Sequence, residues 1–155
     1  MARSLREEIA QRRPFETPEQ EAYLNIIRTA SQLTDAMELL LKPCGITLVQ
    51  YNVLRILRGS EPDGLCRNEL RERMLNRMPD VTRLLDRMED AGLVVRSREE
   101  EDRRQVRTQL TARARRLVNE LDALVTEEHK RRLGHLTKQQ LQSITELLTA
   151  VRLPG

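Results

Sequence analysis

The chain has 155 residues, of which 39% are hydrophobic, 33% are charged and 2% are aromatic. This length allows one domain with a core of its own, and the scarcity of aromatic residues argues against a stacking platform for single-stranded nucleic acid. The sequence has no apolar run near the roughly 18 residues of a membrane span, no secretory signal at its start and no disulfide framework. We therefore expect a cytoplasmic protein without membrane association.

The net charge does not identify a partner. Its formal value is only +3, although the chain has 27 basic residues. Nearly all of them are arginines, whose planar guanidinium pairs bidentately with phosphates and with guanine edges. A genomic composition bias towards arginine would give the same excess. The placement of the arginines is therefore more informative than their number.

The first 16 residues are a charged arm. Ser4 and Glu7 stand at the spacing of a capping box, which predicts a short helix through about Gln11, ended by Pro14. A loosely held tail is the alternative interpretation.

A long helix is predicted next. Thr17 and Pro18, with Gln20 shortly after, form a helix start. From Tyr23 onwards apolar residues keep helical spacing as far as Leu41. A helix of about 25 residues is roughly 37 Å long, and so short a chain has little else to cover its apolar side within one subunit.

Short elements follow in the middle of the chain. A capping box opens a helix over about residues 47–58, and residues 59–64 have turn chemistry. Residues 65–66 form a candidate strand, ahead of a helix over about residues 67–75.

The next helix has the clearest pattern in the sequence. Val81, Leu84, Leu85 and Met88 fall on one apolar stripe. The opposite face is polar and consists of Asp80, Thr82, Arg83, Asp86, Arg87 and Asp90. We place Pro79 in the first turn of this helix.

After this helix the sequence changes its period. Gly92 ends the helix, and the alternating residues that follow predict two short strands, at about residues 93–97 and 105–110, with a charged tip between them.

A helix that buries one face and presents short polar groups and arginines on the other suits the major groove of duplex DNA. Thr82 and Arg83 lie at the end that usually meets base edges. Arg87, one turn later, is expected on the DNA backbone or on a carboxylate of the protein. Asp80 and Asp86 would repel phosphate, so we expect them to pair with nearby arginines.

Three residues on the preceding helix and turn are candidates for phosphate contacts: Asn68, Arg73 and Arg77. Taken singly, each is more readily explained as a solvated surface residue.

The C-terminal part of the chain is again helical. Thr111 begins a helix that is expected to reach about Leu133 and to end at Gly134, and a Thr-x-x-Gln box at Thr137 begins the last one, before Pro154. Long amphipathic helices at both ends of a short chain indicate an oligomer interface, most often a twofold dimer. The alternative is a monomeric bundle in which the end helices pack on the middle.

The chain resembles the MarR family of winged helix-turn-helix regulators in four segments: ITLVQYNVLRILRG, GLCRNELRERM, PDVTRLLDRMEDAGLVVR and EDRRQVRTQLT. The resemblance is close over about residues 46–117, and its most specific element is Asp102-Arg103-Arg104, which five residues separate from Leu110-Thr111. One departure is Ala114, where the family often has glycine.

The resemblance implies one domain, mainly α with a small β-hairpin wing. Residues 1–46 would be an N-terminal arm and dimerisation helix, residues 47–110 the winged helix-turn-helix, and residues 111–155 the C-terminal dimerisation helices. Within the middle region, residues 77–91 would be the recognition helix and residues 98–104 the wing tip.

The function implied by the resemblance is sequence-specific binding of double-stranded DNA. Members of the family are homodimers that bind a pseudo-palindromic operator, mostly as repressors, and commonly release it when a small aromatic or lipophilic acid binds. Arg104 is then the strongest candidate for a minor-groove contact, oriented by Asp102. Arg98 and Arg103 complete the candidates on the wing. A plain surface ion pair is the alternative for Asp102 and Arg104.

Effector residues are harder to name. Family ligands often bind where the DNA-binding region joins the dimer helices, and Tyr51 and Arg55 lie there one turn apart; core packing is the preferred interpretation of Tyr51. Cys66 precedes a helix N-terminus and is followed by Arg67, both of which favour a thiolate. A thiol-based oxidant-sensing repressor is therefore one alternative function, although an inert thiol is preferred for Cys66 and for Cys44. A winged-helix protein-interaction module that does not bind DNA is another.

The sequence has no recognisable catalytic set. His129 and His135 are six residues apart, without a cysteine or an acidic cluster at ligand spacing, and there is no Gly-rich phosphate loop. We expect no enzyme activity, no cofactor and no metal.

Overall fold

Four helices begin at a threonine, as the sequence predicts: α2 (Pro18–Leu41), α3 (Leu48–Arg58), α6 (Ala112–Leu133) and α7 (Lys138–Arg152). In each of them the threonine hydroxyl accepts a backbone N–H three residues further on, at 3.1 or 3.2 Å. This bond satisfies one of the amide groups that lack a partner at a helix N-terminus. The structure, a computed structural model, describes residues 3–98 and 105–153.

The remaining elements are short. They are α1 (Leu5–Glu8), the 3-10 helix η1 (Lys42–Cys44), α4 (Arg67–Arg73), α5 (Val81–Asp90) and the strands β1 (Leu65–Cys66), β2 (Val94–Arg98) and β3 (Val106–Leu110). The strands form an antiparallel sheet in the order β1-β3-β2, in which Thr108 faces Leu65 on one side and Arg96 on the other. The expected class, mainly helical with a small β wing, is confirmed.

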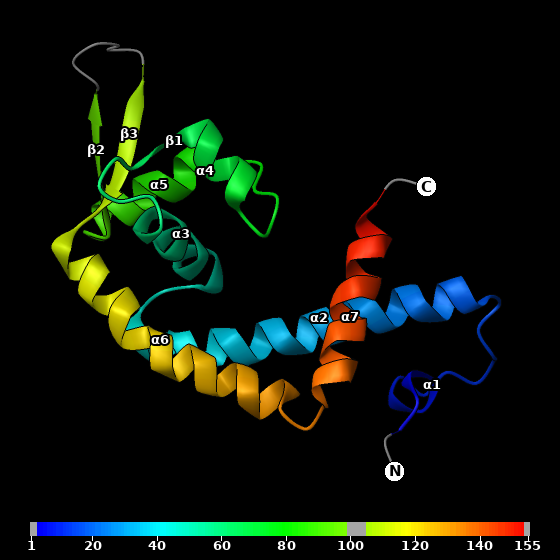
Figure 1. Ribbon diagram of the computed structural model, residues 1–155. Helices are drawn as coiled ribbons and strands as arrows, with labels where there is room; N and C mark the ends of the chain where they lie inside the picture. The colour runs from blue at the N-terminus through cyan, green and yellow to red at the C-terminus, as the bar shows by residue number, and fades with distance from the viewer. Residues whose placement is uncertain (1–2, 99–104, 154–155) are drawn as a thin grey trace.

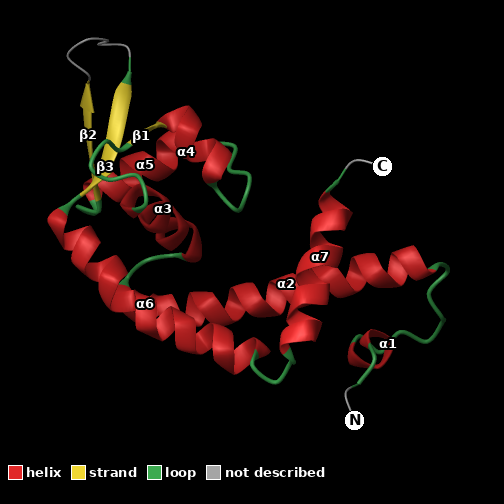
Figure 2. Cartoon of the chain, viewed as in Figure 1, coloured by secondary structure: helices red, strands yellow, loops and turns green. Residues whose placement is uncertain are grey.

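The elements are arranged as a head on two long helices. Figure 1 shows α3, α4, α5 and the sheet gathered at one end, and α2 and α6 leading away from them. The core cluster joins the two parts: Leu54 and Leu57 of α3 and Met88 of α5 pack in the same cluster as Val118 and Leu121 of α6. The hairpin of β2 and β3 projects from the head at the side opposite to the long helices, as the secondary-structure colouring of Figure 2 makes plain.

The N-terminal arm differs from the expectation. Its helix α1 begins at the predicted Ser4 capping box but ends at Glu8, three residues before Gln11. The chain turns back there because the Arg6 guanidinium donates to the carbonyl oxygens of Gln11 and Arg12, at 3.2 and 2.9 Å. The side chain of Leu5 is buried, so this helical turn is also covered by the rest of the protein on one side.

The helix α4 ends earlier than predicted. Its last residue is Arg73 and not Leu75, because the backbone N–H of Leu75 donates to the side-chain oxygen of Asn52 on α3, at 3.1 Å. The N–H of Leu75 thus has an acceptor on α3 in place of the carbonyl oxygen that a further turn of α4 would provide.

The helix α5 begins later than predicted. Its first residue is Val81 and not Arg77, and the placement of Pro79 in its first turn is wrong. The reason is Asp80, whose carboxylate accepts the backbone N–H of Arg83 at 2.9 Å and thereby caps the helix. Pro79 therefore lies in the turn before the cap.

Two glycines with the same backbone conformation differ in how closely other atoms approach them. Gly64 and Gly45 both have a left-handed backbone, with φ of +71° and +72°. A Cβ on Gly64 would lie 2.5 Å from the carbonyl oxygen of Thr108 in β3, whereas a Cβ on Gly45 would meet nothing within 4 Å. We expect Gly45→Ala to lower the free energy of unfolding by about 1 kcal/mol, from backbone strain alone, and Gly64→Ala to lower it by about 3 kcal/mol.

Urea denaturation followed by circular dichroism, at one protein concentration, measures both values. Equal losses for the two variants would show that β1 and β3 separate easily, against the close packing described here.

Glu128 gives the fold a pH dependence. It is the one buried charged residue among those the structure describes, and its side chain is 6% exposed. Its carboxylate accepts hydrogen bonds from Arg132 at 2.7 Å and Arg131 at 2.8 Å, and these bonds hold the pKa of Glu128 below its ordinary value of 4.5. A carboxyl whose pKa is lowered by folding stabilises the protein above its unfolded pKa, and this contribution is lost as the pH falls through the lower, folded value.

We therefore expect Glu128→Gln to be less stable than the parent at pH 7, and the difference to shrink as the pH is lowered below about 4. Thermal unfolding between pH 3 and pH 7 measures it. Glu120→Gln is the matched control, because Glu120 is exposed on the same helix. A difference for Glu128→Gln that does not change with pH would contradict the assignment.

Candidate nucleic-acid interface

The helix α5 turns one side to the core and the other to solvent. Val81, Leu84, Leu85 and Met88 are buried, as their spacing predicts. The polar residues of the opposite side are exposed, and they include Thr82, Arg83, Asp86 and Arg87. The apolar stripe therefore fixes which side chains can meet a partner.

The N-terminal end of α5 is held by α4. Arg67, the first residue of α4, donates from Nη1 to the hydroxyl oxygen of Thr82 at 2.9 Å. Arg67 is not among the site residues predicted from the sequence. The two residues are 15 positions apart and meet only because α4 packs against α5, so no local pattern indicates the contact.

The second half of α5 is held by the wing. Arg96 of β2 pairs with Asp86, at 2.7 Å between Nη2 and Oδ1, and donates from Nε to Glu89 at 2.6 Å. Burial lowers the pKa of the Arg96 guanidinium, but hydrogen bonds to Glu89 and Asp86 raise it by more, so that it stays above its ordinary value. The expectation that an arginine pairs with Asp86 is confirmed. For Asp80 the same expectation is wrong, because its carboxylate accepts a backbone N–H and caps the helix. One guanidinium thus contacts two carboxylates on the exposed side of α5 and offsets one of their two charges.

Three other arginines of this surface are available to contact a partner molecule. Arg83, Arg87 and Arg77 are exposed, and within the part of the chain that the structure describes their guanidinium groups have no protein partner. Arg73 differs, because it donates to the hydroxyl of Ser60 at 3.0 Å.

The wing is described only at its base. Arg98 ends β2 and is exposed. Asn68, a candidate on α4 and not on the wing, is exposed too. The candidates Asp102, Arg103 and Arg104 lie outside the described residues.

Arg67 and Thr82 both line two hollows of this surface. The larger, of about 440 Å³, is also lined by Cys66, Asn68, Leu85, Arg96, Gln105, Val106 and Thr108. The smaller, of about 200 Å³, is also lined by Arg71, Pro79, Asp80 and Val81. The contact between the two residues therefore borders both recesses.

The thiol of Cys66 has an acidic neighbour. Cys66 is half-buried at the start of α4, and its backbone N–H donates to the carboxylate of Glu69 at 2.8 Å. This hydrogen bond lowers the pKa of Glu69, and a hydrogen bond from the Cys66 side chain lowers it further. A carboxylate anion therefore lies beside the sulfur. Cys44 is exposed at the end of η1.

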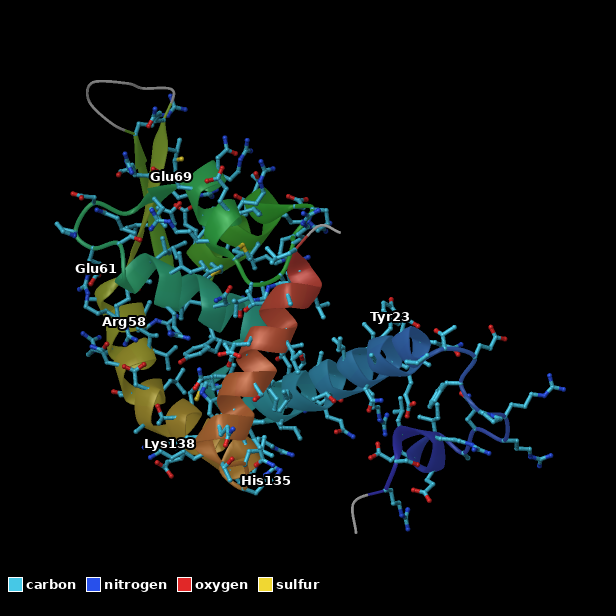
Figure 3. All side chains as sticks on the ribbon, turned by 45° about the vertical axis from the view of Figure 1, so that its right-hand side comes forward. Tyr23, Arg58, Glu61, Glu69, His135 and Lys138 are labelled. Atoms are coloured by element: carbon cyan, nitrogen blue, oxygen red, sulfur yellow. The ribbon has the colours of Figure 1, made fainter. Side chains whose placement is uncertain are left out.

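Two ionic contacts join the head to α6, and Figure 3 labels Arg58 and Glu61, the residue that the head contributes to each. Arg58, at the end of α3, donates to both carboxylate oxygens of Asp122 at 2.8 and 2.9 Å, which lowers the pKa of Asp122. Glu61, in the following loop, accepts from Arg115 Nε at 2.7 Å. Neither pair is predicted from the sequence.

The residues proposed for a ligand lie near this joint. Tyr51 is buried, and the preferred interpretation as a core residue is confirmed; burial raises the pKa of its hydroxyl. Arg55, one turn further along α3, is exposed.

Over residues 3–98 and 105–153, none of the helices has the length and apolar character needed to cross a membrane. The same residues contain no group of His, Cys, Asp and Glu side chains placed to hold a metal ion.

Comparison with known proteins places the chain in a family. The model of the MarR family matches residues 45–105. An HTH-type transcriptional repressor of Mycobacterium tuberculosis is 30% identical over 123 residues, which cover 79% of this chain and 87% of the relative. The crystal structure of a MarR transcription factor from Planctomyces limnophilus is 36% identical, with a TM-score of 0.66, and covers 88% of this chain and 99% of that one.

A third relative was solved together with DNA. It is MepR of S. aureus, 24% identical with a TM-score of 0.75, and the match covers 83% of this chain and 95% of that one. At this identity the likeness concerns the fold alone. The residues matched by the family model and the two closer relatives agree on the identity: the chain belongs to the MarR family of transcriptional regulators.

Proposed function

We propose that the protein is a homodimeric repressor that binds a pseudo-palindromic duplex operator and releases it when a small aromatic or lipophilic ligand binds. The observation that carries the proposal is the exposed side of α5, on which Arg83 and Arg87 are available to a partner while Asp86 and Glu89 are paired with Arg96. The relatives support it: one is named a repressor, and MepR was solved as a complex with DNA. Such a regulator acts in the cytoplasm, and we expect no enzymatic activity.

Each part of the surface has a role in this proposal. Thr82 and Arg83, at the N-terminal end of α5, would meet base edges in the major groove, and Arg87 would meet the backbone. Arg98, Arg103 and Arg104 of the wing would reach the minor groove, with Asp102 orienting Arg104.

The supporting residues would fix the protein on the duplex without reading its sequence. Asn68 and Arg77 would contact phosphates, and Asp80, which follows Pro79, would keep the start of α5 in place. Arg73 is retained as a phosphate contact because a guanidinium has five N–H donors and its bond to Ser60 uses only one.

The dimer is proposed from apolar side chains in contact with water. None of the described residues of α7 is buried, and Leu147 and Val151 are 67% and 64% exposed. Tyr23, near the outer end of α2, is 65% exposed and projects from the helix in Figure 3. A second copy related by a twofold axis would cover such faces.

The proposed dimer divides the chain into dimer helices and a DNA-binding region. Residues 1–46 and 111–155 would form the dimer helices, and residues 47–110 the DNA-binding region. The effector would bind where these parts meet. Arg55, exposed on α3 beside the buried Tyr51, would supply the cation for an acidic ligand.

The DNA-binding surface is tested with Arg83→Ala and Arg104→Ala. Each should weaken binding to an operator selected from a random duplex library, and each should reduce the slope of log K against log salt by about one if the lost contact is to a phosphate. Fluorescence anisotropy in a salt series measures both quantities. Arg116→Ala, at an exposed arginine of α6, is the control and should bind like the parent. If Arg83→Ala and Arg104→Ala also bind like the parent, the surface is assigned wrongly.

The dimer is tested with Leu147→Glu. A carboxylate in the middle of the exposed apolar face should raise the dimer dissociation constant at least about a hundredfold, because burying an unpaired charge costs several kcal/mol. Sedimentation velocity over a dilution series measures the constant. Gln139→Glu adds the same charge to an exposed polar site of α7 and should leave it unchanged. A parent protein that sediments as a monomer at all concentrations would rule out the dimer.

A further inference from the structure

We infer that Arg67 determines base preference indirectly, by holding the hydroxyl of Thr82 in one orientation at the start of the recognition helix. The inference rests on the proposed binding of duplex DNA. It assigns Arg67 as a positioning residue and Thr82 as the side chain that touches the base.

The geometry ties the two side chains together. The guanidinium of Arg67 lies 2.9 Å from the hydroxyl oxygen of Thr82. Both residues are exposed, so the contact is on the surface of the head. Leu85, one turn further along the same helix, is buried and keeps α5 from rotating about its axis. The hydroxyl therefore has a fixed place relative to the rest of the surface.

The direction of the hydrogen bond decides what the hydroxyl can do. A threonine hydroxyl has one hydrogen to donate and two lone pairs to accept with. A cationic donor on one lone pair polarises the O–H bond, which strengthens the hydroxyl as a donor and weakens its remaining lone pair as an acceptor. Thr82 would then favour an acceptor in the major groove, such as guanine O6 or N7 or thymine O4, over the amino groups of cytosine and adenine.

The hollows at the contact are consistent with this role. Both residues line a recess of about 440 Å³ and another of about 200 Å³, so the contact is open to a partner molecule. Because one threonine hydroxyl meets the edge of one base, the effect of losing the contact should be confined to one base pair in each half-site.

The neighbouring Arg71 provides a matched control. It belongs to α4, is exposed and lines the smaller recess together with Arg67. Within the described residues its side chain makes no hydrogen bond to α5. Arg67→Ala and Arg71→Ala remove the same charge from the same helix, but only the first removes a contact with Thr82.

The experiment is selection of bound duplexes from a random library, followed by sequencing, for the parent and for Arg67→Ala, Thr82→Val, the double variant and Arg71→Ala. We expect Arg67→Ala and Thr82→Val to reduce the preference at the same base pair of each half-site by about fivefold or more. The double variant should lose no more than Thr82→Val alone, because the two residues act through one contact. Arg71→Ala should keep the preference of the parent. Circular dichroism of each variant checks that the fold is kept.

Several results would overturn the inference. If Arg67→Ala weakens binding to all sequences equally and lowers the salt slope by about one, Arg67 is a phosphate contact. If it changes a base pair that Thr82→Val does not change, Arg67 reads that base pair itself. An unchanged preference would mean that the contact has no role in reading. If the parent selects no duplex at all, the proposed function fails as well, and this result is distinct from the others.

Discussion

Burial of one side of α5 is the constraint on which the rest of the DNA-binding proposal depends. Val81, Leu84, Leu85 and Met88 are all buried, and each contributes about 2 kcal/mol by leaving water. Rotation of the helix about its axis would expose some of them and bury charged groups in exchange, at a much larger cost. The orientation of Thr82 and Arg83 is therefore determined by residues that never contact a partner.

Charge placement follows from the same orientation. The carboxylates of Asp86 and Glu89 lie on the exposed side of α5 together with the arginines, and a bare acidic group there would oppose binding to phosphate. Arg96 on the neighbouring strand reduces this conflict, since its guanidinium contacts both carboxylates and offsets one of their two negative charges. The same contacts connect the wing to the recognition helix, so that the two parts that would enter adjacent grooves have a fixed relation. Binding to DNA would therefore depend on where the arginines lie and not on the small net charge of +3.

Local signals explain what could be predicted from the sequence. The helix starts at Thr17, Thr47, Thr111 and Thr137 were predicted correctly because a cap involves residues only three positions apart. The buried face of α5 was predicted because it depends on periodicity alone. The start of α5 was misplaced because Pro79 is acceptable in a first helical turn, and only the geometry shows that Asp80 takes the role of the cap.

Contacts between elements could not be predicted. Arg67 with Thr82, Arg58 with Asp122 and Arg115 with Glu61 are 15, 64 and 54 positions apart. In a chain so rich in arginine and acidic residues, many pairings of this kind are equally compatible with the sequence. The packing of α3, α4 and α6 selects among them, and that packing is set by apolar residues elsewhere.

The hydrogen bonds and ion pairs between the end of α3, the loop after it and α6 connect the head to α6. Arg58 contacts both oxygens of Asp122 and also Asn119, while Glu61 contacts Arg115 one to two turns away along the same helix. In the proposed dimer the separation of the two recognition helices would therefore follow the angle between the two copies of α6. A ligand could alter operator binding only by favouring one such angle over another, and the shift would be limited by its difference in affinity for the two arrangements. A ligand at the joint would be able to do so because it would touch both α3 and α6, whereas a ligand bound on the outer part of α2 would contact neither.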